Sequence, residues 1–146
     1  MSIHQISNNE NVVDASHGPA QPISLIASGA VDLDTLNAFE DLQSDDGSDL
    51  IVELIDLYVG ELPRLVTEIC KAVIETEWAS LKRAAHALKG SSASLGVRHV
   101  AETCAKLERM DGNDSPETVA TLVRLLEYES AMVNASLAAI RQRRLR

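Results

Sequence analysis

From about residue 32 onward, apolar residues recur at spacings of three and four, which is the pattern of an α-helix that buries one face. The pattern predicts a short helix over about 33–43, a turn at Ser-Asp-Asp-Gly-Ser, and then four longer helices joined by short connections. Short connections place consecutive helices antiparallel, so we expect an all-α, antiparallel, up-and-down four-helix bundle with a short additional N-terminal helix. The predicted inward positions are Leu33, Leu36, Phe39 and Leu42; Ile51, Leu54, Tyr58, Leu62, Leu65, Ile69 and Val73; Trp78, Leu81, Ala85, Leu88, Ser92 and Leu95; Val97, Val100, Cys104, Leu107 and Met110; and Val119, Leu122, Leu126, Val133 and Ile140.

Local signals predict where these helices begin, end and bend. Pro63 lacks a backbone donor, so we expect a kink or break between residues 59 and 63. Thr76 is expected to cap the helix that follows it, and Leu95-Gly96 to mark a bend. Ser115 followed by Pro116 is typical of a helix start.

Residues 1 to about 30 show no helical period and are rich in Asn, Ser, Gly and Pro. We therefore predict a flexible N-terminal tail over 1–30 and one bundle domain over 31–146, with Ile23, Leu25 and Ile26 as residues that could pack on the bundle. Cys70 and Cys104 have neither metal-type nor redox-type spacing. They are predicted to be buried free thiols, which suits a reducing cytoplasm.

Composition and charge exclude several classes of protein. The net charge of −9 over 146 residues argues against general nucleic-acid binding. No apolar run reaches the roughly 18 residues that span a bilayer, and the N-terminus lacks the pattern of a secretion signal. We therefore expect a cytoplasmic protein with no nucleic acid or membrane partner. The C-terminal Arg-Gln-Arg-Arg-Leu-Arg could bind an acidic surface or nucleic acid, but cations that complement a helix C-terminus are the favoured interpretation.

Residues 84–96, Ala-Ala-His-Ala-Leu-Lys-Gly-Ser-Ser-Ala-Ser-Leu-Gly, contain the candidate chemistry. At the helical period, His86 falls roughly 120° from the middle of its helix's buried stripe, so the imidazole is expected to project outward. Residues three and four positions apart are neighbours on a helix surface. The predicted neighbours of the ring are Ala79, Lys82, Arg83, Lys89, Gly90 and Ala93.

Gly90 is unexpected inside a helix, where glycine costs about 1 kcal/mol relative to alanine. We interpret it as leaving open space beside the imidazole, the alternative being that it relieves packing against a neighbouring helix. Charge also changes sign here, because residues 32–77 hold thirteen acids against two bases, whereas residues 78–110 hold six bases against two acids. Such a face would attract an acidic pocket or a phosphate, unless it is only an ordinary solvated surface.

Histidine is largely neutral and nucleophilic near neutral pH, and a phosphoryl group on its ring would gain from the nearby Lys89 ammonium. The sequence has neither a glycine-rich nucleotide loop nor an acidic cluster for magnesium around His86. His86 could therefore carry a phosphoryl group but could not by itself take one from ATP.

His86-Ala-Leu-Lys89-Gly90-Ser-Ser, followed by Leu95-Gly96 and by Cys104-Ala-Lys-Leu107-Glu108, resembles the histidine-containing phosphotransfer (HPt) domain family over about residues 32–142. The resemblance implies an antiparallel four-helix bundle in which His86 accepts a phosphoryl group from a receiver-domain aspartate and passes it to another receiver domain. It implies roles for Lys89 as charge partner and Gly90 as clearance for docking.

The same resemblance implies a monomeric phosphocarrier rather than an enzyme with its own nucleotide site. Its partners would be response-regulator receiver domains and a hybrid sensor histidine kinase, with Mg²⁺ supplied by the receiver. Ala79, Lys82, Arg83 and Ala93 are the candidate partner-binding residues. Family members often orient the imidazole with a polar residue on the next helix, and here Lys106, Glu108 and Arg109 are all candidates.

Two other functions fit an all-α bundle of this kind. A metal- or cofactor-holding bundle needs inward Glu-x-x-His pairs, but Arg83 lies three residues before His86, and His99 with Glu102 forms a single reversed pair. The other is a non-catalytic interaction module that docks receiver domains or kinases without phosphotransfer. An intact set of His86, Lys89 and Gly90 argues against it.

Overall fold

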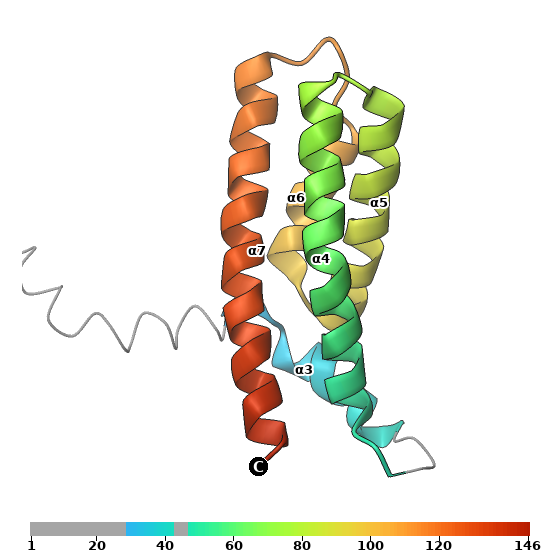
Figure 1. The fold of residues 1–146 in the computed structure, drawn as a ribbon, viewed down its shortest axis with the longest axis vertical. Coiled ribbons are helices and arrows are strands. Elements are labelled where there is room, and N and C mark those ends of the chain that lie inside the picture. Colours follow the sequence, from blue (N-terminus) through green and yellow to red (C-terminus); the bar gives the residue numbers. More distant parts are fainter. Residues whose placement is uncertain (1–28, 43–46) are drawn as a thin grey trace, which may run out of the picture.

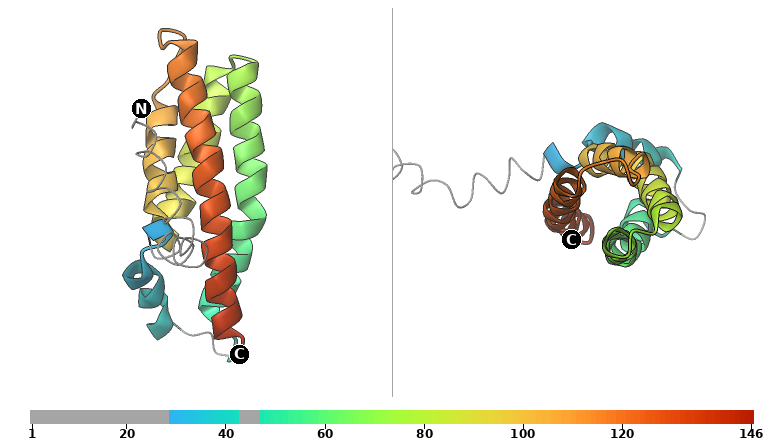
Figure 2. Two further views of the ribbon diagram at one scale, coloured as in Figure 1. Left: turned by 90° about the vertical axis from the view of Figure 1, so that its left-hand side faces the viewer. Right: turned by 90° about the horizontal axis from the view of Figure 1, so that it is seen from above.

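The structure is a computed structural model and describes residues 29–42 and 47–146. Its elements are α3 (Leu33–Asn37), the 3₁₀-helix η1 (Ala38–Asp41), α4 (Leu50–Ile74), α5 (Trp78–Leu95), α6 (Arg98–Glu108) and α7 (Pro116–Arg144). The long helices run antiparallel, with α3 and η1 near one end (Figure 1). Seen from above, α4, α5, α6 and α7 stand in chain order around the core, and each packs on its neighbours (Figure 2). This confirms the predicted all-α up-and-down bundle.

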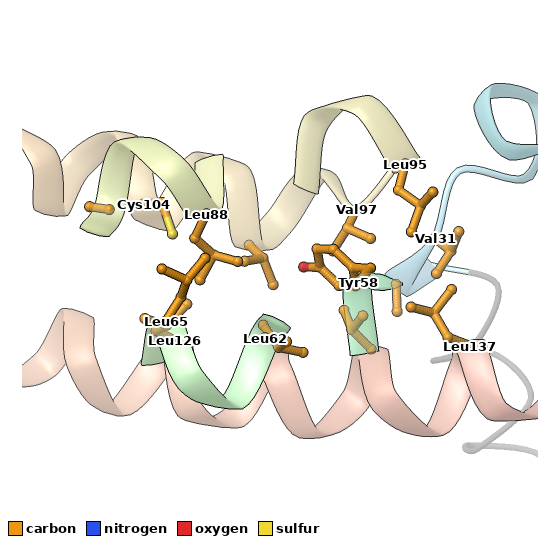
Figure 3. Close-up of a cluster of buried hydrophobic side chains, with 14 of the residues drawn as sticks. Val31, Tyr58, Leu62, Leu65, Leu88, Leu95, Val97, Cys104, Leu126 and Leu137 are labelled. Carbon is orange, nitrogen blue, oxygen red and sulfur yellow. The ribbon is translucent and has the colours of Figure 1, made fainter. Parts of the chain in front are cut away.

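The core contains the apolar stripes that the sequence predicts, and also buried residues outside them, such as Ile55 and Leu137. Leu62, Leu88 and Leu126 of three different helices are fully buried and belong to one cluster (Figure 3). Burying a leucine side chain of this kind contributes roughly 1.5–3 kcal/mol. The remaining predicted positions of α4 to α7 are buried, or partly buried against that cluster. The partly buried positions are Leu54, Val73, Trp78, Met110 and Leu122.

The core contains one polar bridge between α4 and α5. The Tyr58 hydroxyl lies 2.7 Å from the Ser92 hydroxyl, and both side chains are buried. Burial raises the pKa of Tyr58, so the phenol stays neutral. The bridge explains why the buried stripe of α5 tolerates Ser92, since its hydroxyl has a hydrogen-bond partner in the Tyr58 hydroxyl.

The first predicted helix is only partly right. Leu36 is fully buried and Phe39 packs against the core, but Leu33 and Leu42 are 41% and 61% exposed. The α-helix ends at Asn37 and continues as a 3₁₀-helix, which has three residues per turn. The change of period interrupts the stripe before Leu42, whereas Leu33 is the first residue of α3. The predicted turn that follows includes residues 43–46, which lie outside the described residues.

Of the kink or break predicted between residues 59 and 63, the break is wrong, because α4 runs through Pro63 from Leu50 to Ile74. Pro63 is exposed, and the neighbouring Leu62 and Leu65 are only 1% and 3% exposed. The lost hydrogen bond and the steric cost of proline total about 3 kcal/mol. Apolar packing on both sides of Pro63 holds the helix together despite that cost.

The predicted cap at Thr76 is also wrong. The N-cap of α5 is Glu77, which makes no side-chain capping bond. Thr76 instead has a left-handed backbone, with φ of 52°, and its hydroxyl donates to the Glu75 carbonyl at 2.6 Å. The Thr76 side chain therefore binds a carbonyl at the end of α4, and the start of α5 has no side-chain cap.

The other two boundary predictions are confirmed. Gly96 ends α5 with φ of 86°, and the Val97 N–H donates to the Ser92 carbonyl at 2.8 Å, so the chain bends as expected. The Ser115 hydroxyl accepts from the Thr118 N–H at 3.1 Å, one residue before Pro116 begins α7.

Of the predicted tail, residues 1–28 lie outside the described residues, including Ile23, Leu25 and Ile26. Ala30, which was assigned to the tail, is buried together with Val31. Cys104 is buried and free as predicted, whereas the free thiol of Cys70 is only half-buried and lies 3.6 Å from a Glu127 carboxylate oxygen. Within the described ranges, no helix is long and apolar enough to cross a membrane.

The C-terminal arginines bind within the chain. The Arg144 guanidinium lies 2.7 Å from an Asp49 oxygen and 2.9 Å from a Glu40 oxygen, and Arg141 lies 2.7 Å from Asp56. These pairs join the end of α7 to α4 and η1. Hydrogen bonds from Arg144 also lower the pKa of Asp49. Arg141 and Arg144 therefore form ion pairs within the chain that link the end of α7 to α4 and η1.

Candidate functional site

His86 lies on the outward face of α5, as its position in the helical period predicts. Its side chain is 68% exposed, whereas the adjacent Ala85 and the nearby Leu88 are fully buried. The buried stripe fixes the rotation of the helix, and that rotation turns His86 outward. The imidazole is therefore accessible to another macromolecule while its backbone is held by the core.

Glu108, the last residue of α6, joins His86 to Lys89. One carboxylate oxygen lies 2.9 Å from His86 Nδ1, and the other lies 2.7 Å from Lys89 Nζ. The Glu108 side chain is 20% exposed, so at this junction of α5 and α6 the carboxylate is partly shielded from solvent. Two residues of the α5 motif and one of α6 thus form a single cluster.

The charge state of Glu108 determines which ring nitrogen of His86 is free. The hydrogen bond from Lys89, followed by that from His86, lowers the pKa of Glu108, so the side chain is a carboxylate at neutral pH. A carboxylate only accepts hydrogen bonds, and so Nδ1 must carry the proton. In neutral imidazole the lone pair is then on Nε2, the nitrogen that Glu108 does not contact.

Glu108 occupies a position that local helix energetics disfavour. The C-terminal end of a helix carries partial negative charge and favours cations by roughly 0.3–1 kcal/mol. A carboxylate here runs against that preference, and the Lys89 ammonium offsets it. Residues that break a local rule concentrate at functional sites.

The structure selects one of the three residues that the sequence left open for orienting the ring. Glu108 contacts His86, whereas Lys106 and Arg109 are exposed. The sequence places Glu108 four residues after the inward-facing Cys104, but only the structure shows that this part of α6 meets His86 and Lys89 of α5.

Gly90 lies one turn after His86 and borders open solvent. A Cβ atom built on it would meet nothing within 4 Å beyond its own helix backbone. The alternative that Gly90 relieves packing against a neighbouring helix is therefore contradicted. The four other candidate contact residues, Ala79, Lys82, Arg83 and Ala93, are all exposed on α5. The surface around the imidazole therefore carries small residues and positive charge.

A groove between α4 and α5 adjoins this face, and the sequence analysis did not predict it. Leu57 on one side of it is 71% exposed, and Ser91 and Ser94 line the opposite side. Leu57 does not belong to the buried stripe of α4, and an apolar residue off the stripe is the signal that could have identified it.

His99, which the alternative of a metal-holding bundle would use, lies on α6 and not beside His86. His99 Nδ1 is 4.0 Å from a Glu102 oxygen, and both side chains are more than half exposed on α6. Among the residues that the structure describes, no three His, Cys, Asp or Glu side chains form a group that could hold a metal ion. The exposed His99 therefore offers a natural control for His86.

Residues 53–142 match the family model of the Hpt domain. Histidine-containing phosphotransfer protein 2 of Arabidopsis thaliana is 28% identical over 89 residues, a match that spans 59% of this chain and 56% of that protein. Phosphorelay protein LuxU of Vibrio harveyi is 30% identical over 78 residues, or 52% of this chain and 68% of that protein.

The fold also matches a solved structure. Histidine-containing phosphotransfer protein B from Pseudomonas aeruginosa PAO1 superposes with a TM-score of 0.69 at 23% identity, over 78% of this chain and 96% of that one. At this identity the likeness supports the fold alone, and the family model supports the assignment. The chain belongs to the Hpt domain family.

Proposed function

We propose that this chain is a phosphorelay intermediate in which His86 accepts a phosphoryl group from a receiver-domain aspartate and passes it to another receiver domain. The observation that carries the proposal is an exposed imidazole with Nδ1 bound to Glu108, in a chain that belongs to the Hpt domain family. Exposure supplies access, and the hydrogen bond supplies the correct tautomer.

On this chain the chemistry uses the side chains of His86, Glu108 and Lys89. The Nε2 lone pair of His86 forms a bond to phosphorus as the bond between phosphorus and the aspartyl oxygen breaks, which returns an aspartate carboxylate to the receiver. The Lys89 ammonium binds the Glu108 carboxylate, and its positive charge limits the repulsion between Glu108 and the incoming phosphoryl group. Mg²⁺ would be supplied by the acidic pocket of the receiver.

The exposed face of α5 is the proposed docking surface. Ala79, Gly90 and Ala93 place only small groups beside the exposed imidazole. Lys82 and Arg83, also exposed on α5, add positive charge. A receiver's acidic phosphorylation pocket is complementary in charge, which favours rapid association. Receiver domains and a hybrid sensor histidine kinase are therefore the proposed partners of a monomeric carrier without its own nucleotide site.

Phosphoryl transfer from a labelled receiver tests the assignment. The wild-type chain should acquire one label that is lost in acid and stable in base, as expected of phosphohistidine. The variant His86→Gln should acquire none, whereas His99→Gln, which removes an exposed histidine on α6, should be labelled like the wild type. A label that persists in His86→Gln would contradict the proposal. Receiver binding without labelling of the wild type would favour the non-catalytic interaction module.

A further inference from the structure

The carboxylate of Glu108 lies on the side of the imidazole opposite the proposed reacting nitrogen. We propose that Glu108 holds the Nδ1 proton on His86 after the ring is phosphorylated, and thereby sets the lifetime of the phosphoryl group and the pH range of its transfer. The inference rests on the proposed function. Glu108 acts here as a positioning residue, because it contacts Nδ1 and not the phosphoryl group.

The two sides of the ring differ in their surroundings. Nδ1 donates over 2.9 Å to a carboxylate that is 20% exposed, whereas the His86 side chain as a whole is 68% exposed. Lys89 binds the other oxygen at 2.7 Å and so fixes the direction of the carboxylate. The proton is thus held on the sheltered side, and the reacting nitrogen remains on the accessible side.

Phosphorylation changes what this proton does. Once Nε2 bonds to phosphorus and Nδ1 keeps its proton, the ring carries a positive charge, which the Glu108 carboxylate stabilises. When the bond between Nε2 and phosphorus breaks, its electron pair returns to Nε2 and a neutral imidazole leaves. Without the Nδ1 proton the leaving group would be an imidazolate anion, which is far poorer. The proton therefore speeds transfer to a receiver aspartate and also speeds loss of the phosphoryl group to water.

Among the groups around the site, Glu108 is the one that holds the Nδ1 proton of His86. Its pKa is lowered by Lys89 and His86, both on α5. Burial raises the pKa of the Cys104 thiol beneath it to about 12, so that thiol is neutral. The elements around the site also carry Lys82 and Arg83 on α5, Lys106 on α6 with Arg109 just after it, Glu129 on α7, and Glu61 and Arg64 beside the groove on α4.

The test follows the pH dependence of phosphoryl loss and of transfer from phosphorylated His86 in the wild type, Glu108→Gln and Lys89→Met. The glutamine amide oxygen can still accept from Nδ1 but carries no charge. The pH at the midpoint of the rate profiles for phosphoryl loss and transfer should therefore fall by about one unit or more in Glu108→Gln. At about pH 8 that variant should hold its phosphoryl group roughly tenfold longer and donate it roughly tenfold more slowly. In Lys89→Met, loss of the cation should leave the midpoint unchanged or raise it.

Equal midpoints in the wild type and Glu108→Gln would overturn the inference, and so would a falling midpoint in Lys89→Met that matches it. Ring ¹⁵N spectra of the phosphorylated wild type give a second measurement that needs no variant. They should show Nδ1 protonated at about pH 8, and an unprotonated Nδ1 there would overturn the inference. An unlabelled wild type would instead refute the proposed function, so the two failures are distinguishable.

Discussion

The face around Gly90 and the corner around Gly96 use the same residue type, six positions apart, for different reasons. At Gly90 an added Cβ would meet nothing within 4 Å, and the backbone is ordinary helix. At Gly96 the backbone has φ of 86°, and an added Cβ would lie 2.8 Å from the Asp32 carbonyl oxygen. The fold therefore requires glycine at position 96 but not at position 90, where we attribute it to a docking partner.

Thr76 sharpens this contrast, because it occupies the same kind of position as Gly96. Each follows a helix, has positive φ and precedes a residue whose N–H bonds to a carbonyl five residues back. Gly96 lies against Asp32, whereas Thr76 is exposed. The close contact, together with the left-handed backbone, makes position 96 intolerant of a side chain.

The largest expected effect on the fold is that of Gly96→Ala. A left-handed backbone costs a residue with a Cβ about 1–2 kcal/mol, and the contact with Asp32 adds to it. We expect the free energy of unfolding to fall by about 2–3 kcal/mol in denaturant titrations. Gly90→Ala is the matched control and should raise it by about 0.5–1 kcal/mol. Equal stability of the two variants would break the comparison.

Gly90→Gln should lower phosphoryl transfer without lowering stability. A long side chain beside His86 should obstruct the receiver, and we expect the transfer rate to fall about tenfold, equivalent to about 1.4 kcal/mol. Gly60→Gln is the matched control, since Gly60 is also an exposed helical glycine with open space around it, on α4. Rapid-quench transfer rates should separate the two. Equal rates would show that clearance is not the role of Gly90.

Thr76→Gly should stabilise the protein. The left-handed backbone that costs threonine about 1–2 kcal/mol is open to glycine, and the greater freedom of glycine in the unfolded chain offsets part of that gain. We expect the free energy of unfolding to rise by about 1 kcal/mol, with an unchanged transfer rate. A loss of stability would indicate that the bond from the Thr76 hydroxyl to Glu75 outweighs the strain.

Arg144→Met tests whether the ion pairs at the end of α7 are independent of the His86 site. Loss of the pairs with Asp49 and Glu40 should lower the free energy of unfolding by about 0.5–1 kcal/mol at neutral pH. The pKa of Asp49 is lowered in the fold, so its stabilising effect is present above the ordinary carboxyl range and is lost as pH falls through the folded value. The difference between variant and wild type should therefore shrink in acid, while transfer at neutral pH stays unchanged.

The sequence was sufficient for the bundle and for the direction of His86, because both follow from the period of apolar residues. It failed where a local rule competed with packing. Pro63 predicts a break, but burial of Leu62 and Leu65 keeps α4 continuous. Thr76 has the side chain of a helix cap, but the turn places it in a left-handed conformation one residue too early.

By itself, the sequence determined which residue could carry a phosphoryl group, since the helical period exposes His86 and the surrounding motif leaves space and positive charge there. Only the tertiary structure decided which residue holds its ring. Lys106, Glu108 and Arg109 lie within one turn of each other at the end of α6, and a choice among them depends on how α6 is rotated against α5. The packing of Cys104 and Leu107 sets that rotation and brings the Glu108 carboxylate to His86 and Lys89.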